Sequence, residues 1–243
     1  MADMRNGNKI EILYEDNHVL VVEKPPNMLT QGDSTGDEDL LTLLKKDLKL
    51  RYNKPGDVYL GLVHRLDRPA GGAMVFAKTS KAASRLSEQI RNGKLDKSYL
   101  AVIYGVPAES SGTLIHYLIK DETINTVSVA KSPEEGERAS LEYKVKGSRD
   151  GLSLVSIKLH TGRSHQIRVQ LAAMGHPLYG DQKYGVSLNK PGMQLALWSV
   201  KLGFAHPTLK QYQAYQSTPP RVYPWNIFVD EEYLLNGEIY TST

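Results

Sequence analysis

The chain has 243 residues, of which 40 % are apolar and 23 % are charged, and its net charge is +3. This ordinary globular composition excludes a mainly disordered, collagenous or repeat protein, and the absence of cysteine excludes a disulfide scaffold, a zinc ribbon and a thiol nucleophile. The sequence has no run of about 18 apolar residues and no signal-peptide pattern, so we expect a cytoplasmic protein without a membrane span. Its mild excess of basic residues fits a polyanionic partner but is shared by many proteins that have none.

The first 51 residues predict a β-hairpin followed by a helix. Residues 10–14 and 18–24 are rich in β-branched and apolar side chains, and Asp16-Asn17 fits the turn between them. Pro25 ends the second strand, because proline cannot continue a hydrogen-bonded ladder. Residues 38–51 have the pattern of an amphipathic helix, with acidic residues at its start and basic residues at its end, as the helix dipole favours.

The middle of the chain predicts further strands around one more helix. We expect strands at 59–66 and 73–78, a helix capped by Thr79 or Ser80 and stopped by Gly93, a strand at 98–104, and then strands at 113–119, 124–130, 139–146 and 152–160. The last four strands are separated by short turns, and such sequential strands form an antiparallel meander.

The last third of the chain predicts a short helix, a long loop and one more strand. The helix is expected at 164–174, with Ser164 as its cap and Gly175 as its stop. A loop rich in Gly, Pro and Tyr follows at 175–192, then a strand at 195–204 and a Pro-rich tail. No linker divides the sequence, so we expect a single α+β domain on a mixed, mainly antiparallel sheet flanked by helices and loops.

Two segments gather charged side chains at places where sites often lie. The segment His64-Arg65-Leu66-Asp67-Arg68 follows a predicted buried strand, and a solvated strand end with a salt bridge is an equally good interpretation of it. Arg168 is expected in the first turn of the helix at 164–174, where the positive end of the dipole calls for a nearby carboxylate or phosphate. A flexible surface arginine is the alternative. Asp67 and Arg168 would make a natural pair, but spacing alone does not prove their contact.

A third segment places Tyr99 in a predicted strand beside Lys94 and Lys97. A strand tyrosine usually packs in the core, and the alternative is a ring that stacks on a nucleobase. The sequence contains no Walker loop, no GxSxG elbow and no HExxH motif, and its seven histidines are scattered. We therefore predict no metal site.

Together these segments resemble the RluA-type pseudouridine synthases. The matching stretches are HRLDRPAGGAMVFAK (64–78), KSYLAVIYG (97–105) and TGRSHQIRVQLAAMGHPLYGDQKYG (161–185), preceded by ILYEDNHVLVVEKPPNMLTQ and followed by LGFAHP (202–207). Pro69-Ala70-Gly71 replaces the usual Thr-Ser-Gly after HRLD. The family often carries an N-terminal S4-type RNA-binding domain, and only about nine residues precede the first motif. We therefore expect one catalytic domain over 1–243, with a core at about 10–207 and no N-terminal S4-type domain.

The resemblance implies an isomerase that converts uridine to pseudouridine in ribosomal or transfer RNA, as a monomer and without a metal or organic cofactor. Asp67 would be the essential carboxylate, which either attacks C1′ or removes a sugar proton. Tyr99 would stack on the uracil and help remove the C5 proton, and Arg168 would pair with Asp67. Contacts with the RNA or the substrate are expected from His64, Arg65, Arg68, Lys97, Arg163, His165 and Leu202, the last in the uracil pocket.

Two other functions compete with this interpretation. An N-glycoside hydrolase also cleaves at C1′ but normally manages a water with a second carboxylate, and only one carboxylate lies in the three key segments. A non-catalytic RNA-binding module is the other alternative. The presence of both Asp67 in HRLD and Arg168 in HQIR argues against it.

Overall fold

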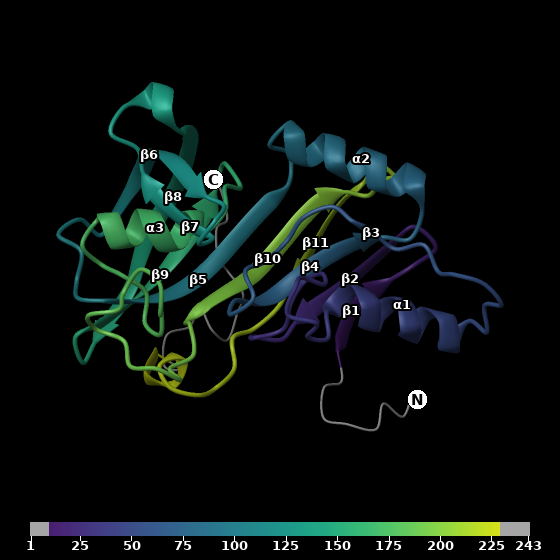
Figure 1. Ribbon diagram of the computed structural model, residues 1–243, viewed down its shortest axis with the longest axis horizontal. Helices are drawn as coiled ribbons and strands as arrows, with labels where there is room; N and C mark the ends of the chain where they lie inside the picture. The colour runs from purple at the N-terminus through teal and green to yellow at the C-terminus, as the bar shows by residue number, and fades with distance from the viewer. Residues whose placement is uncertain (1–9, 229–243) are drawn as a thin grey trace. The chain divides into compact units, whose positions relative to one another are not determined.

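The computed structural model describes residues 10–228 (Figure 1). These residues divide into two compact units, each with its own hydrophobic core. The first unit contains residues 10–95 and 202–217, and the second contains 96–201 and 218–228. Strand β10 (Leu197–Ala205) begins in the second unit and ends in the first. The expectation that the chain is one catalytic domain stays a prediction.

The first unit is built on the predicted hairpin. Strands β1 (Glu11–Glu15) and β2 (Val19–Lys24) pair antiparallel, and β2 pairs antiparallel with β4 (Gly71–Ala77) on its other side. The turn is held by Asp16, whose Oδ1 accepts hydrogen bonds from the backbone N–H groups of His18 and Val19, both at 2.7 Å. An Asp side chain that binds the following backbone is the reason that Asp-Asn favours a turn here.

Both helices of the first unit begin after a side-chain cap, and for the second helix this cap is Thr79, one of the two that the sequence offered. Helix α1 (Leu40–Arg51) begins after Asp39, which accepts a hydrogen bond from the backbone of Thr42. Helix α2 (Ser80–Arg91) begins after Thr79, which accepts one from Ala82. The core of this unit consists of buried side chains from β2, β4, α2 and the end of β10: Val19, Val21, Ala73, Val75, Ala77, Ala82, Leu86, Leu95, Leu202 and Phe204.

Within the described residues, and apart from the start of β10, the second unit contains five antiparallel strands and one α-helix that packs against them (Figure 1). The strands are β5 (Asp96–Tyr104), β6 (Ser111–Asp121), β7 (Thr126–Val129), β8 (Glu137–Arg149) and β9 (Leu152–Leu159). Their order is β5-β9-β8-β6-β7. The prediction of a simple meander was wrong in one respect, because β8 pairs with β6 and not with β7. A 3-10 turn at Pro133–Glu135 carries the chain from β7 to the opposite edge of β6.

Two strands differ further from the prediction. The strand predicted at 59–66 is reduced to β3 (Gly61–Leu62), so HRLD lies in a loop before β4 instead of at the end of a strand. In this region side chains form hydrogen bonds with backbone groups. His64 Nε2 accepts a hydrogen bond from the Val75 N–H at 3.1 Å, and Thr30 Oγ1 donates one to the Leu66 carbonyl at 3.0 Å. The Pro-rich tail also contains a strand that the sequence analysis missed, β11 (Tyr212–Gln216), beside β10.

The helix of the second unit, α3 (Gln166–Ala173), is capped differently from the prediction. The residue at its N-cap is His165, which has a left-handed backbone conformation (φ 51°) and makes no side-chain capping bond. Ser164 is therefore not the cap. The predicted α+β class is confirmed by the antiparallel pairings and by the α-helices α1, α2 and α3 within residues 10–228.

Candidate active site

The loop before β4 places Asp67 among groups that hold the loop in shape. Asp67 is half-buried, and its backbone carbonyl accepts a hydrogen bond from the Ala70 N–H at 3.0 Å, which closes a tight turn. Arg65 and Arg68 are exposed on either side of it. The Arg68 guanidinium lies 2.7 Å from the Asp37 carboxylate and also donates to the carbonyl of Asn27. Both arginines are therefore placed at the surface, as contacts with phosphate require.

Lys24 is a charged residue of this region that the sequence analysis missed. Its side chain is fully buried, and Nζ donates to the carbonyls of Pro25, Met28 and Arg68 at 2.9, 2.8 and 3.0 Å. Burial lowers the pKa of Lys24 to about 7, and the negative charge of Asp67 acts in the opposite direction. The only signal in the sequence is a lysine that ends an apolar strand just before two prolines. That pattern gives no reason to expect the ammonium group to lie inside the protein.

Strand β5 carries Tyr99 and Lys97. Tyr99 is 6 % exposed and lies opposite Ile157 of β9. Burial lowers the pKa of Lys97. A Cβ atom added at Gly162 would lie 3.0 Å from Lys97 Nζ, so this ammonium lies directly against the Thr161-Gly162-Arg163 segment. The structure thus brings together two of the sequence motifs within the second unit.

A buried glutamine fixes the same segment to the start of α3. Gln166 Oε1 accepts hydrogen bonds from Thr161 Oγ1 at 2.8 Å and from the Arg163 N–H at 3.0 Å. Gln166 Nε2 donates to the carbonyl of Ser140 and to Gln170 Oε1. Because both polar ends of this side chain are satisfied inside the protein, α3 is buried along polar as well as apolar positions.

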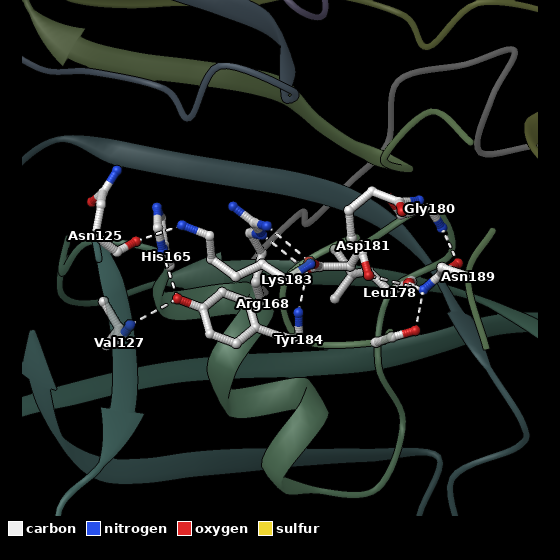
Figure 2. Close-up of polar contacts among 12 residues, drawn as sticks. Asn125, Val127, His165, Arg168, Leu178, Gly180, Asp181, Lys183, Tyr184 and Asn189 are labelled. Atoms are coloured by element: carbon white, nitrogen blue, oxygen red, sulfur yellow. Dashed lines mark hydrogen bonds and ion pairs between the residues drawn. The ribbon is translucent and has the colours of Figure 1, made fainter. Parts of the chain in front are cut away.

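Arg168 is the third residue of α3 and is 5 % exposed. Its guanidinium makes two hydrogen bonds to Asp181, from Nε to Oδ2 and from Nη2 to Oδ1, both at 2.8 Å (Figure 2). The anion that the helix dipole calls for is therefore present as a carboxylate. Burial alone would raise the pKa of Asp181, but the hydrogen bonds and charge of Arg168 outweigh it and lower that pKa. The sequence analysis missed Asp181.

Tyr184 connects Arg168 to His165. The centre of the Arg168 guanidinium lies 5.1 Å from the centroid of the Tyr184 ring, which is a cation–π distance. The Tyr184 hydroxyl lies 2.6 Å from His165 Nδ1 and accepts a hydrogen bond from the Val127 N–H at 2.9 Å (Figure 2). The loop that follows α3 thus holds His165 and Arg168 of the HQIR motif.

Two further predicted site residues, Arg163 and Leu202, differ in their surroundings. Arg163 is exposed and lies 3.0 Å from the Glu137 carboxylate. Leu202 is fully buried in the core of the first unit. Asp67 belongs to the first unit, and Tyr99 and Arg168 belong to the second. The predicted pairing of Asp67 with Arg168, the catalytic roles and the uracil-pocket role of Leu202 stay predictions.

Residues 18–173 match the sequence family described as RNA pseudouridylate synthase, and this match covers more than half of the chain. It contains the loop with Asp67 and the whole of helix α3 with Arg168. The chain belongs to the RNA pseudouridylate synthase family. The predicted resemblance to the RluA-type enzymes is thereby confirmed.

Individual relatives agree with this family. "Ribosomal large subunit pseudouridine synthase C" of Buchnera aphidicola is 32 % identical over 207 residues, which cover 82 % of this chain and 64 % of that protein. "Uncharacterized RNA pseudouridine synthase YhcT" of Bacillus subtilis is 35 % identical over 202 residues, covering 82 % and 65 %. The chain therefore matches just under two thirds of the length of these relatives. The structure of "Human RNA Pseudouridylate Synthase Domain Containing 1" superposes with a TM-score of 0.71 at 26 % identity, covering 91 % of this chain and 89 % of that one.

Proposed function

We propose that this chain isomerises uridine to pseudouridine in RNA, with ribosomal RNA as the favoured substrate and transfer RNA as the alternative. The observation that carries the proposal is the family match over residues 18–173, which includes both Asp67 and Arg168. Ribosomal RNA is favoured because relatives at 32 % and 29 % identity are named for the ribosomal large subunit.

The reaction breaks the bond between C1′ and N1 of a uridine and forms a bond between C1′ and C5. The proton on C5 leaves, N1 gains a proton, and the mass of the RNA stays the same. Asp67 takes part as a carboxylate in one of two ways: it attacks C1′, or it removes a sugar proton to give a glycal. The uridine must leave its stack to reach a carboxylate that is half-buried in the protein, so we expect the base to be flipped out.

The buried Lys24 supports the role of Asp67. Lys24 places a buried ammonium whose charge interacts with Asp67, and attraction between the two favours a fixed carboxylate. Arg168 is assigned to pair with and orient Asp67. Tyr99 is assigned to stack on the uracil and to assist loss of the C5 proton.

The surface arginines and the basic composition support binding to RNA phosphates. Arg65 and Arg68 flank Asp67, and Arg163 is exposed in the second unit. Contacts of this kind make affinity fall steeply with salt. The proposal includes a cytoplasmic monomer that needs no metal or organic cofactor, because the detached uracil stays bound and returns. None of the helices within residues 10–228 is long and apolar enough to cross a membrane.

The test is to incubate the purified chain with ribosomal RNA and, separately, with transfer RNA. We expect new carbodiimide-reactive pseudouridines in the ribosomal RNA and no change in RNA mass, with EDTA present or absent. Loss of a base, seen as a lower mass, would identify a hydrolase instead. Binding without any modified uridine in either RNA would identify a non-catalytic binding module. Modification of transfer RNA alone would move the substrate to the alternative class.

A further inference from the structure

The loop between α3 and β10 contains a carboxylate for which the family motifs gave no role. Asp181 is 1 % exposed, and every hydrogen bond it accepts through its side chain comes from α3 or from its own loop within the described residues. A buried carboxylate is costly unless it is paired and hydrogen-bonded. Its position therefore calls for an explanation beyond packing.

The two oxygens of Asp181 accept hydrogen bonds from different donors. Oδ1 accepts from the backbone N–H groups of Lys183 and Tyr184 at 2.9 and 3.0 Å, and also from Arg168 Nη2. Oδ2 accepts from Arg168 Nε. One oxygen therefore closes the turn of the loop, and together the two oxygens grip one edge of the guanidinium. Such a planar two-bond fork fixes both the position and the orientation of an arginine head.

The loop itself is built to hold this carboxylate. Gly180 has φ +78°, and a Cβ atom there would overlap the carbonyl of Gln194, so only glycine fits the position before Asp181. Asn189 binds the loop from within, because its Nδ2 donates to the carbonyls of Leu178 and Asp181 at 3.1 Å (Figure 2). The carboxylate is thus carried by a backbone that has little room to move.

Tyr184 completes the support from the same loop. Its ring lies beside the Arg168 guanidinium, and its hydroxyl is fixed to the backbone of β7 through Val127. The Arg168 head is therefore held at one edge by Asp181 and at one face by Tyr184. The edge that carries Nη1 lies on the side away from Asp181, because Nε and Nη2 form the opposite edge of the same plane.

We propose that Asp181 is a positioning residue, which holds the Arg168 guanidinium in the orientation that the isomerisation needs. The inference rests on the proposed function, in which Arg168 orients the catalytic carboxylate Asp67. Asp181 acts only through Arg168 and does not touch the substrate. It follows that removing Asp181 harms turnover only while Arg168 is present.

The test compares turnover in Asp181→Asn, Arg168→Met and the double variant, with Glu142→Gln as the matched control. Asn keeps an oxygen for the turn at Lys183 and Tyr184 but loses the charge and one acceptor for Arg168. Glu142 is a half-exposed carboxylate of the second unit that pairs with His160. We expect kcat to fall at least 30-fold in Asp181→Asn with RNA affinity within about threefold of wild type. Asp181→Asn should cause no further loss of kcat when added to Arg168→Met.

A purely structural role gives a different result. In that case Asp181→Asn lowers kcat by the same factor with and without Arg168, and in proportion to its loss of thermal stability. That result, or wild-type kcat in Asp181→Asn, would overturn the proposal. If Arg168→Met keeps wild-type kcat, the fault lies in the role that the proposed function gives to Arg168.

A second measurement does not depend on activity. In ¹⁵N NMR, the Arg168 Nε–H should be rigid and slow to exchange in the wild type and in Glu142→Gln, and mobile in Asp181→Asn. The double variant Arg168→Met/Asp181→Asn checks that the loop folds when both charges are removed. An Arg168 side chain that stays equally rigid in a folded Asp181→Asn protein would contradict the inference even if no RNA substrate were found.

Discussion

Lys24 and Arg168 are a lysine and an arginine buried within residues 10–228, and their surroundings differ. Lys24, in the first unit, is held by the backbone carbonyls of Pro25, Met28 and Arg68, and its pKa falls to about 7 because it is buried. Arg168, in the second unit, is held by the carboxylate of Asp181. An arginine stays charged throughout the physiological range, whereas a buried lysine does not. The first region therefore holds a charge that can be titrated near neutral pH, and the second holds a permanent one.

The difference suggests that the two cations have different roles. A guanidinium gripped by a carboxylate is suited to orient a second group, because its plane is fixed. An ammonium surrounded by carbonyls acts as a point charge and as a tie between β2 and the loops that follow residues 24 and 67. The predictions below test each half of this comparison, first in turnover, from the largest expected effect to the smallest, and then in stability.

The largest effect is expected at Asp67, the carboxylate whose charge interacts with Lys24. Asp67→Asn should abolish pseudouridine formation, by at least about 1,000-fold or several kcal/mol of transition-state stabilisation, with folding and RNA binding retained. Single-turnover assays against wild type measure it. Asp57→Asn, at an exposed carboxylate of the same unit, is the control and should keep full activity. Activity of Asp67→Asn within tenfold of wild type would remove Asp67 from the mechanism.

The next largest effect on turnover is expected at Arg168, which carries the permanent charge. Arg168→Lys keeps a cation but cannot form the planar fork with Asp181, so turnover should fall about 100-fold with little change in RNA affinity or its salt dependence. Arg149→Lys, at an exposed arginine of the same unit, should leave both unchanged. If Arg168 instead binds phosphate, Lys will substitute well and Arg168→Ala will lower the salt slope by about one unit.

Tyr99 provides a comparison without any change of charge. Tyr99→Phe should keep substrate affinity within about twofold, because stacking needs only the aromatic face. Turnover should fall at least about tenfold if the hydroxyl assists removal of the C5 proton. Rapid-quench measurement of product formation separates the two quantities. Full activity in Tyr99→Phe would leave this buried ring with a packing role only.

The last prediction concerns stability and not turnover, and it is the pH dependence of unfolding at Lys24. Between pH 7 and the ordinary lysine pKa, the unfolded chain binds more protons than the folded one, because the pKa is about 7 only in the folded state. The free energy of unfolding should therefore gain a contribution that rises with pH above 7, by at most about 1.4 kcal/mol per unit, and that is flat below 7.

Urea unfolding of wild type and Lys24→Met at several pH values isolates this contribution. The difference between the two should grow above pH 7, whereas the exposed Lys81→Met variant should follow wild type throughout. A difference between wild type and Lys24→Met that stays constant from pH 6 to 9 would show that Lys24 keeps its proton, and the contrast with Arg168 would disappear.

The sequence predicted local elements well where a single side chain decides them. Asp16 closes the first hairpin and Thr79 begins the second helix of the first unit, because each binds backbone groups within three residues. The cap of α3 was predicted wrongly, because His165 reaches the N-cap position in a left-handed conformation that no helix pattern signals. Contacts between residues that are close in the sequence can be predicted from it, whereas an unusual backbone conformation such as that of His165 cannot.

The missed site residues depend on contacts that only the fold creates. The first helical turn indicated that Arg168 needs an anion, but nothing in the spacing pointed to Asp181, which lies thirteen residues further along in an irregular loop. Lys24 ends an apolar strand, and its burial depends on the carbonyl of Arg68, which is 44 residues away. The motifs therefore indicated which residues carry charge but not what holds them.

The most direct test of the central claim uses RNA labelled with tritium at C5 of uridine. Isomerisation through C5 releases that tritium to water, so we expect one equivalent for each pseudouridine formed by the wild-type protein, with the RNA mass otherwise unchanged and no release by Asp67→Asn. Free uracil that keeps its tritium would show hydrolysis at C1′ instead. The absence of tritium release from both ribosomal and transfer RNA would contradict the assignment of this chain as a pseudouridine-forming enzyme.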